Sequence, residues 1–263
     1  MPLPEIAALV VAHPRVTFTQ SVVSGLAEAG GILVTCDARF IPAAMLLPLQ
    51  AHFIQTERLA QQVEASKPTC KRLWQQIVRA KITAQGRTLK ALHGDDAGLP
   101  ALLRRVRSGD PANVEAQASR RYWRALFADD KFRRNPDSDD QNRHLNYGYA
   151  VLRAVVARAL CAAGLHPSIG LHHHNRYNPF CLADDLMEPW RPVVDGVVAR
   201  WVREHGTKAP LDRDAKSALI ETITGRYRVG GEARTLFDVL SRTAASLVAV
   251  FAGGRRDLVL PEK

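Results

Sequence analysis

The chain is 263 residues long, which suffices for one large domain or for a small and a medium domain, each with its own core. Hydrophobic residues make up 46% and charged residues 24% of the composition, with 17 Gly and 15 Pro, so collagen-like, low-complexity and wholly disordered classes are excluded. A membrane-spanning protein is also excluded, because the apolar stretches at 40–49 and 244–254 fall well short of the roughly 18 to 20 residues that a bilayer demands.

The net charge of +10 is unevenly placed along the chain. Residues 1–66 carry a net charge of −2 and the remainder carries +12. Positive charge confined to one part of a chain favours a polyanionic partner such as DNA, although a merely soluble basic protein fits the charge equally well. The first five residues lack the basic region of a secretory signal, and the four scattered cysteines form no Cys-x-x-Cys pair, so we expect a cytoplasmic protein with reduced thiols.

The first fifty residues predict a small N-terminal β domain. Short β-branched runs bounded by His-Pro and Gly-Gly breakers predict strands at 6–11, 16–19, 32–36 and 40–49. A short helix is expected at 19–29, ended by Gly30 and Gly31. With so few strands, this sheet over residues 1–50 is predicted to be small and incomplete.

Residues 51–263 predict a larger, all-α domain, which makes the fold class α+β. Leu73, Ile77 and Ile82 recur at helical spacing, with nearby basic residues expected mostly off this apolar stripe. Asp110-Pro111 predicts a helix start that continues to 127, and Asn178-Pro179 predicts another. Further helices are expected at 145–163, 193–205, 212–224 and 232–251, with a polar loop at 131–141.

The segment 171–192 carries the strongest chemical signal. Three histidines, 172–174, precede a helix in which Asp184 and Asp185 lie within one turn of Glu188. Carboxylates this close repel one another, so either an arginine such as Arg191 or a bound cation must offset them. A solvated acidic face beside surface histidines is the alternative, which we favour less because the acids alternate with large apolar residues.

Mixed nitrogen and oxygen ligands of this kind suit Mn²⁺ or Mg²⁺ better than structural zinc. They leave coordination positions for water and a phosphate oxygen, as a phosphodiester enzyme requires. Glu115 is the best candidate for a further ligand, although by itself it could equally be a first-turn glutamate favoured by the helix dipole.

Three motifs in the right order resemble the CRISPR-associated integrase of the spacer-adaptation module, the family numbered one, in particular its type II branch. These are DPANVEAQASRRYWRALF at 110–127, HLNYGYAVLRAVVARALCAAGLHPSIGLHHHN at 144–175 and HHHNRYNPFCLADDLMEPWRP at 172–192. The resemblance covers residues 6–250. It implies that Glu115, His173 and Glu188 are the catalytic metal ligands for Mg²⁺ or Mn²⁺, with Asp185 and Asp184 supporting them. His172 and His174 cannot be separated from His173 by chemistry alone.

The resemblance also implies a reaction and partners. The enzyme would insert prespacer double-stranded DNA into a repeat array by attack of a 3′-hydroxyl on a phosphodiester. It would act as a homodimer that joins a small ferredoxin-like partner in a heterohexamer, with the type II effector nuclease taking part. Residues expected to contact DNA phosphates as a group are Lys71, Arg72, Arg79, Lys81, Arg120, Arg121, Arg124, Arg133 and Arg134. Asn146, Tyr147 and Tyr149 are expected to lie in the core and to make hydrogen bonds between helices.

One feature departs from the family pattern. Members normally carry some dozens of residues of additional strand before the stretch that matches residues 6–15, so the chain is predicted to be N-terminally shortened. The alternatives are a catalytically silent DNA-binding subunit, whose shortened sheet prevents assembly, and a related integrase that serves a mobile element.

Overall fold

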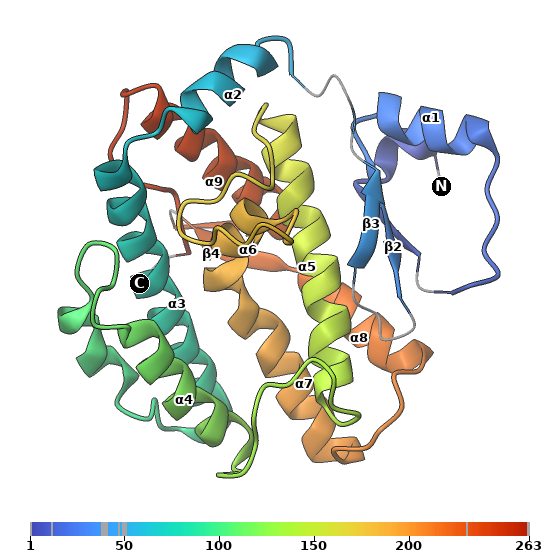
Figure 1. Ribbon diagram of the computed structural model, residues 1–263. Helices are drawn as coiled ribbons and strands as arrows, with labels where there is room; N and C mark the ends of the chain where they lie inside the picture. Colours follow the sequence, from blue (N-terminus) through green and yellow to red (C-terminus); the bar gives the residue numbers. More distant parts are fainter. Residues whose placement is uncertain are drawn as a thin grey trace.

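The computed structural model describes residues 2–11, 13–37, 42–46, 48, 52–229 and 231–261. A small N-terminal sheet with one helix lies beside the long helix α5 (Asn142–Ala162), and α3 (Lys67–His93) and α4 (Val114–Phe127) lie on the opposite side of the molecule (Figure 1). The predicted fold class is therefore confirmed. The predicted domain boundary at residue 50 falls outside the described residues and stays a prediction.

The N-terminal sheet has three strands in the order β1 (Ala8–Val11), β2 (Ile32–Cys36) and β3 (Pro42–Leu46). β1 and β2 are parallel and are connected by α1 (Gln20–Glu28), whereas β3 runs antiparallel to β2. The predicted strand at 16–19 is wrong, because these residues lead into α1 with Val16 and Phe18 exposed. Of the predicted strand at 40–49, residues 42–46 form β3, and residues 40, 41, 47 and 49 lie outside the described part. Ile32 and Val34 pack on Ala154 of α5, so the sheet rests against the helical body.

The helical body holds the main core. Its apolar stripe on α3 includes Leu73, Ile77 and Ile82, all fully buried as predicted. None of the helices in the described residues is long and apolar enough to cross a membrane. The remaining helical elements are η1 (Leu3–Glu5), α2 (Gln55–Val63), η2 (Leu99–Arg105), α6 (Cys181–Met187), η3 (Glu188–Trp190), α7 (Arg191–His205), α8 (Arg213–Ile223) and α9 (Leu236–Phe251).

Two helix starts differ from the predicted ones. α4 begins at Val114, with Asn113 as its N-cap, because the Asp110 carboxylate accepts hydrogen bonds from the backbone N–H groups of Val114 and Glu115 at 3.0 and 2.9 Å. Asp110 therefore satisfies the first donors of the helix from four residues upstream. α6 begins at Cys181, and the chain continues through η3 into α7 with almost no break.

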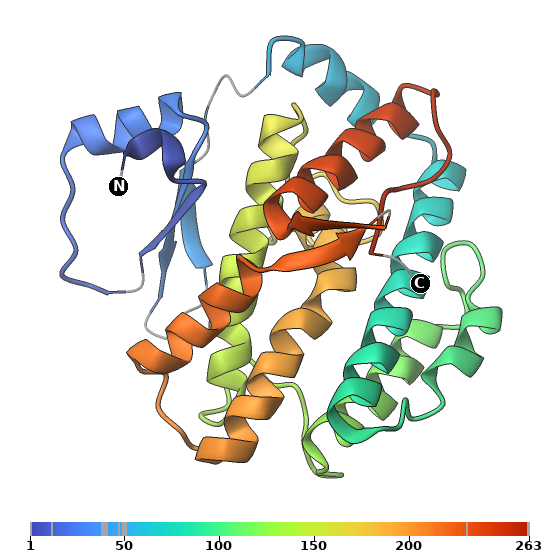
Figure 2. The ribbon, with the colours of Figure 1, turned by 180° about the vertical axis from the view of Figure 1, so that it is seen from behind.

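The helical domain also contains a β-hairpin that the sequence did not predict. Strands β4 (Arg226–Val229) and β5 (Glu232–Thr235) are antiparallel, and the predicted helix from 232 begins only at Leu236. The hairpin lies between α8 and α9 (Figure 2). Its Tyr227 contacts Trp190 edge-on, with the ring centroids 5.8 Å apart. Because Trp190 ends η3, the hairpin supports the element that begins with Glu188.

Candidate active site

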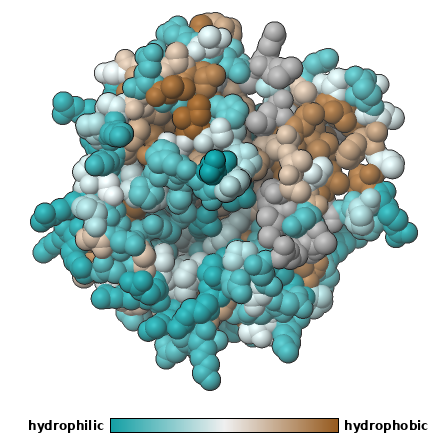
Figure 3. Space-filling view, viewed as in Figure 1, coloured by the Kyte–Doolittle hydropathy of each residue, from teal (hydrophilic) through white to brown (hydrophobic). Residues whose placement is uncertain are grey.

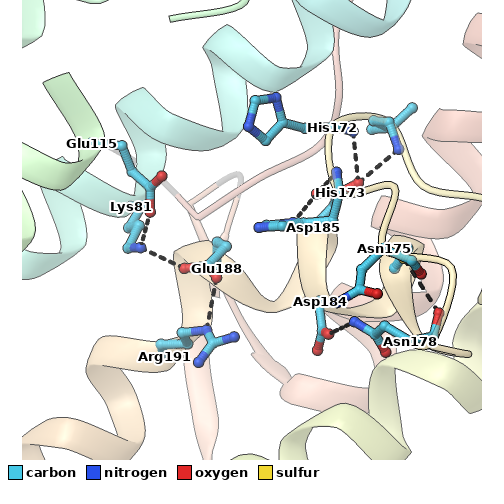
Figure 4. Close-up of polar contacts among 12 residues, drawn as sticks. Lys81, Glu115, His172, His173, Asn175, Asn178, Asp184, Asp185, Glu188 and Arg191 are labelled. Atoms are coloured by element: carbon cyan, nitrogen blue, oxygen red, sulfur yellow. Dashed lines mark hydrogen bonds and ion pairs between the residues drawn. The ribbon is translucent and has the colours of Figure 1, made fainter. Parts of the chain in front are cut away.

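Glu115 and Glu188, far apart in sequence, meet at one cation. The Nζ of Lys81 on α3 lies 2.5 Å from Oε1 of Glu115 on α4 and 2.6 Å from Oε2 of Glu188 on η3. On the other side of Glu188, Oε1 lies 2.9 Å from Nε of Arg191. Figure 4 shows the Lys81 ammonium between the two carboxylates. The structure thus brings two of the three predicted metal ligands together.

Within this cluster, Glu188 and Lys81 are both held in their charged forms at neutral pH. Burial by itself would raise the pKa of Glu188, but Arg191 and Lys81 outweigh it and hold the pKa at about 2. Burial by itself would lower the pKa of Lys81, but Glu188 and Glu115 outweigh it and raise the pKa. A buried charge that loses its partner is strongly destabilising, so the four side chains depend on one another.

The position of Lys81 differs from the sequence prediction. Its side chain is only 9% exposed, and it lies on the apolar stripe, between Ile77 and Ile82, rather than off it. The four-residue spacing from Ile77 was the signal that could have located it on the buried face. Lys81 therefore contacts carboxylates inside the protein and does not present its charge on the surface.

His173 is fixed by Asp185, whose side chain is fully buried. The Asp185 carboxylate accepts hydrogen bonds from the backbone N–H groups of Leu171, His172 and His173 at 2.6, 3.0 and 3.3 Å. It also lies 2.6 Å from Nδ1 of His173. Since a carboxylate only accepts, Nδ1 carries a proton and Nε2 is left for a metal ion. In Figure 4 the ring extends from Asp185 toward Glu188.

The three adjacent histidines have different surroundings, which sequence chemistry could not distinguish. The hydrogen bond to Asp185 raises the pKa of His173. His172 instead stacks on Trp74 of α3, with ring centroids 4.1 Å apart and planes 2° from parallel. His174 is exposed. Of the three, His173 is the one held by a carboxylate and directed at the cluster.

Asp184 points to another set of partners. Its carboxylate accepts hydrogen bonds from Nε of Arg153 on α5 and from Nδ2 of Asn178, each at 2.7 Å. It therefore ties the loop after the histidines to α5 and stays apart from the Lys81 cluster. The prediction that positive groups must offset the crowded acids is confirmed for Glu188 by Arg191 and for Asp184 by Arg153.

A group of buried polar side chains supports Arg191, and its central member is Asp195, which was not among the residues predicted from the sequence. The guanidinium of Arg191 lies over the Tyr149 ring, 4.6 Å from its centroid. The Tyr149 hydroxyl donates to Asp195, and the Tyr122 hydroxyl donates to the same carboxylate at 3.0 Å. Tyr149 thus makes an interhelical hydrogen bond, as predicted. Asp195 lies one turn beyond Arg191 on α7, and nothing in the local sequence marks it as buried.

Most of the predicted DNA-contacting residues lie on the surface. Figure 3 shows a largely hydrophilic face over α3 and α4. Arg134 differs, because its guanidinium donates to Oδ1 of Asn142 at 2.8 Å and to Oδ1 of Asn146 at 2.6 Å and so braces a loop against α5. Arg134 and Lys81 therefore do not fit the predicted role in phosphate contact. Arg72 is half-buried, and the exposed members are Lys71, Arg79, Arg120, Arg121, Arg124 and Arg133.

Glu115, Glu188 and His173 carry ligand atoms of the kinds that a divalent ion prefers, but their side chains are not gathered around a common point. Among the described residues, no three His, Cys, Asp or Glu side chains are close enough together to hold a metal ion. Glu115 and Glu188 nevertheless share a cation, the Lys81 ammonium, and His173 offers Nε2 on the same side. Two carboxylate oxygens and one imidazole nitrogen are ligands that suit Mn²⁺ or Mg²⁺.

The family model described as "CRISPR associated protein Cas1" matches residues 1–222. The chain belongs to the Cas1 family. The CRISPR-associated endonuclease Cas1 of Neisseria meningitidis serogroup C is 40% identical over 269 residues, which cover 100% of this chain and 86% of the relative. The CRISPR-associated endonuclease Cas1 1 of Francisella tularensis subsp. novicida is 29% identical over 96% of this chain and 87% of its own length. The resemblance found in the sequence motifs is confirmed.

Solved structures show the same fold at lower identity. A casposase bound to its integration product has a TM-score of 0.77 at 19% identity and covers 97% of this chain and 80% of the casposase chain. A chain of a Cas6-RT-Cas1–Cas2 complex has a TM-score of 0.76 at 20% identity and covers 98% of this chain and 32% of that longer chain. The Cas1 fold therefore extends over nearly the whole of this chain.

Proposed function

We propose that this Cas1 protein is a metal-dependent DNA endonuclease and integrase that inserts prespacer DNA into a CRISPR repeat array. The observation that carries the proposal is the meeting of Glu115 and Glu188 at one cation, with the His173 ring directed toward them. The names of the full-length relatives, which are CRISPR-associated endonucleases, support the nuclease part of the proposal.

Glu115, His173 and Glu188 would hold Mg²⁺ or Mn²⁺, which when bound would neutralise charge on the scissile phosphate and lower the pKa of an attacking hydroxyl. Asp185 keeps the His173 proton on Nδ1 and so keeps Nε2 available. Arg191 keeps Glu188 ionised and fixes one of its oxygens. These residues therefore hold the donor set in position before substrate arrives.

The proposed reaction exchanges one phosphodiester for another. The 3′-oxygen of the prespacer forms a bond to phosphorus and gives up its proton, while the bond to the 3′-oxygen of the repeat strand breaks and that oxygen takes up a proton. Because the number of phosphodiesters is unchanged, no nucleoside triphosphate is needed. With water in place of the 3′-hydroxyl, the same site would cleave DNA.

The proposed partners follow from the charge and from the comparisons. Double-stranded DNA would contact the exposed basic residues of α3 and α4, which position a duplex without reading its sequence. The Cas6-RT-Cas1–Cas2 neighbour supports Cas2 as a partner, and we propose that Cas2 is the small ferredoxin-like protein expected from the sequence. We further propose a homodimer that joins this partner in a heterohexamer in the cytoplasm, with the type II effector nuclease taking part.

A strand-transfer assay tests this function. The purified chain, with and without the small partner, is incubated with Mg²⁺ or Mn²⁺, a labelled prespacer-like duplex and a supercoiled plasmid that carries a repeat. We expect metal-dependent joining that Glu115→Gln and His173→Ala abolish and that the exposed-residue control Glu64→Gln leaves unchanged. DNA binding without joining or cleavage in any of these mixtures would instead indicate a silent DNA-binding subunit.

A further inference from the structure

Lys81 places its positive charge between the carboxylates of Glu115 and Glu188, where those two negative charges require a cation. Its ammonium lies 2.5 Å from Glu115 and 2.6 Å from Glu188, and its side chain is 9% exposed. Glu188 is similarly buried at 7%, but Glu115 is 25% exposed, so the cluster opens toward solvent on the side of α4. An ion could enter, and the lysine head could leave, on that side.

We propose that Lys81 is a built-in counter-ion that holds Glu115 and Glu188 together in the metal-free protein and competes with the divalent ion for them. This inference rests on the proposed function, because it concerns the same donor set. It gives Lys81 a positioning role that differs from the phosphate contact expected from its sequence.

Positive and negative formal charges within the cluster are equal in number. The four side chains Lys81, Arg191, Glu115 and Glu188 are together neutral. Without Lys81 the two carboxylates would repel each other in a largely buried place, and their approach would cost stability. The lysine therefore keeps the ligands in place while no metal ion is bound.

Because the cluster is already neutral with Lys81 in place, the lysine competes with a divalent ion for the two carboxylates. A divalent ion added to the neutral cluster would leave two excess positive charges beside one another, which is costly away from water. The excess falls if the ammonium moves away, and a lysine head on its flexible four-carbon stem can do so. DNA phosphates near the open side would also reduce the excess. Metal binding without DNA should therefore be weak in the natural protein.

The test is a Mn²⁺ titration of the full chain without DNA, with free Mn²⁺ measured by electron paramagnetic resonance. Lys81→Met keeps a similar length and removes the charge, so we expect it to bind Mn²⁺ at least tenfold more tightly than the unaltered protein. Its melting temperature in EDTA should fall and should recover when Mn²⁺ is added. Lys90→Met, at an exposed position in the last turn of α3, is the matched control and should behave as the unaltered protein.

Equal or weaker Mn²⁺ binding by Lys81→Met would overturn the competition. Should that variant not fold in EDTA, Lys81→Arg gives a second test. It keeps the charge, so it should remain folded and bind Mn²⁺ as weakly as the unaltered protein, and tighter binding would contradict the inference.

The strand-transfer assay, run on the same preparations, separates the two proposals. Joining that depends on Glu115, together with equal Mn²⁺ affinities for the unaltered protein and Lys81→Met, would leave the proposed function standing and overturn the role of Lys81. Absence of joining and of Glu115-dependent Mn²⁺ binding in every variant would overturn the proposed function and the inference together.

Discussion

Asp185→Asn should loosen the histidine loop and disorient His173 at the same time. The carboxylate accepts four hydrogen bonds, two on each oxygen: Leu171 and His172 donate to Oδ2, and the backbone and ring of His173 donate to Oδ1. Asparagine has the same shape, but its NH₂ group would face two of these donors. Two charge-assisted hydrogen bonds are therefore lost, and the other two are made to a neutral acceptor.

The size of the effect follows from these four contacts. Hydrogen bonds to a charged group contribute about 1.5 to 3 kcal/mol each, so losing two of them should cost about 3 to 6 kcal/mol of unfolding free energy. For a chain of this size, that corresponds to a melting temperature lower by about 10 °C. The His173 pKa, raised by its hydrogen bond to Asp185, should fall toward the ordinary value of 6.5.

The pH dependence has a definite sign. A histidine whose pKa is raised in the folded protein adds stability that is fully present below its unfolded pKa and is lost as the pH rises through its folded pKa. The difference between the natural protein and Asp185→Asn should therefore be larger at pH 6 than at pH 9.

Thermal unfolding in EDTA at both pH values, with NMR titration of the histidine ring protons, measures both effects. Asp184→Asn is the matched control, because it loses the ion pair with Arg153 but leaves the contact between His173 and Asp185 intact. The charge of Asp184 raises the His173 pKa less than Asp185 and Glu188 do, so we expect this variant to keep most of the rise. A melting temperature for Asp185→Asn within about 2 °C of the natural protein, with an unchanged His173 titration, would refute this account of the loop.

Three further predictions concern the loop, the group of buried polar side chains and the surface. Gly170→Ala should lower the melting temperature and weaken Mn²⁺ binding, because the added Cβ would lie 2.3 Å from the backbone oxygen of His173. Unchanged values in a thermal shift assay and a Mn²⁺ titration would contradict this prediction. Burial raises the pKa of Asp195 from 3.8 to about 7 despite the tyrosine hydrogen bonds, so stability present below pH 4 is lost as the pH rises through 7. Denaturant unfolding should show the natural protein losing about 2 to 4 kcal/mol relative to Asp195→Asn between pH 4 and 8, and parallel curves would contradict this. The exposed arginines Arg120, Arg121 and Arg124 of α4 can be replaced together by glutamine. The slope of log affinity for duplex DNA against log salt concentration should then become less steep by up to about 3, as measured by fluorescence anisotropy. An unchanged slope would show that DNA binds elsewhere.

The sequence by itself determined the elements whose signals are local. The spacing of Leu73, Ile77 and Ile82 marked the buried face of α3, because helical periodicity places such residues on one side whatever they pack against. The acids of 184–188 and the histidines before them were recognisable as a site, since close carboxylates need a positive partner in any fold. Glu115 was already the best candidate for a further ligand, and the match to a family pattern then distinguished it from an ordinary first-turn glutamate.

The tertiary structure decided what depends on contacts between distant segments. Asp110 was expected to cap a helix at the next residue but instead bonds donors four and five residues on, which only the observed turn allows. The hairpin of β4 and β5 packs its Tyr227 on Trp190, a contact between distant segments that no local preference encodes.

Lys81 is the clearest case of a residue whose role depends on contacts between distant segments. In sequence it is one of several lysines and arginines on a basic helix, and its neighbours in space, Glu115 and Glu188, are 34 and more than 100 residues away along the chain. Whether a lysine meets DNA or carboxylates depends on which surfaces are buried against it. Its charge is fixed by the sequence, but its partner is fixed by the packing of α3, α4 and η3.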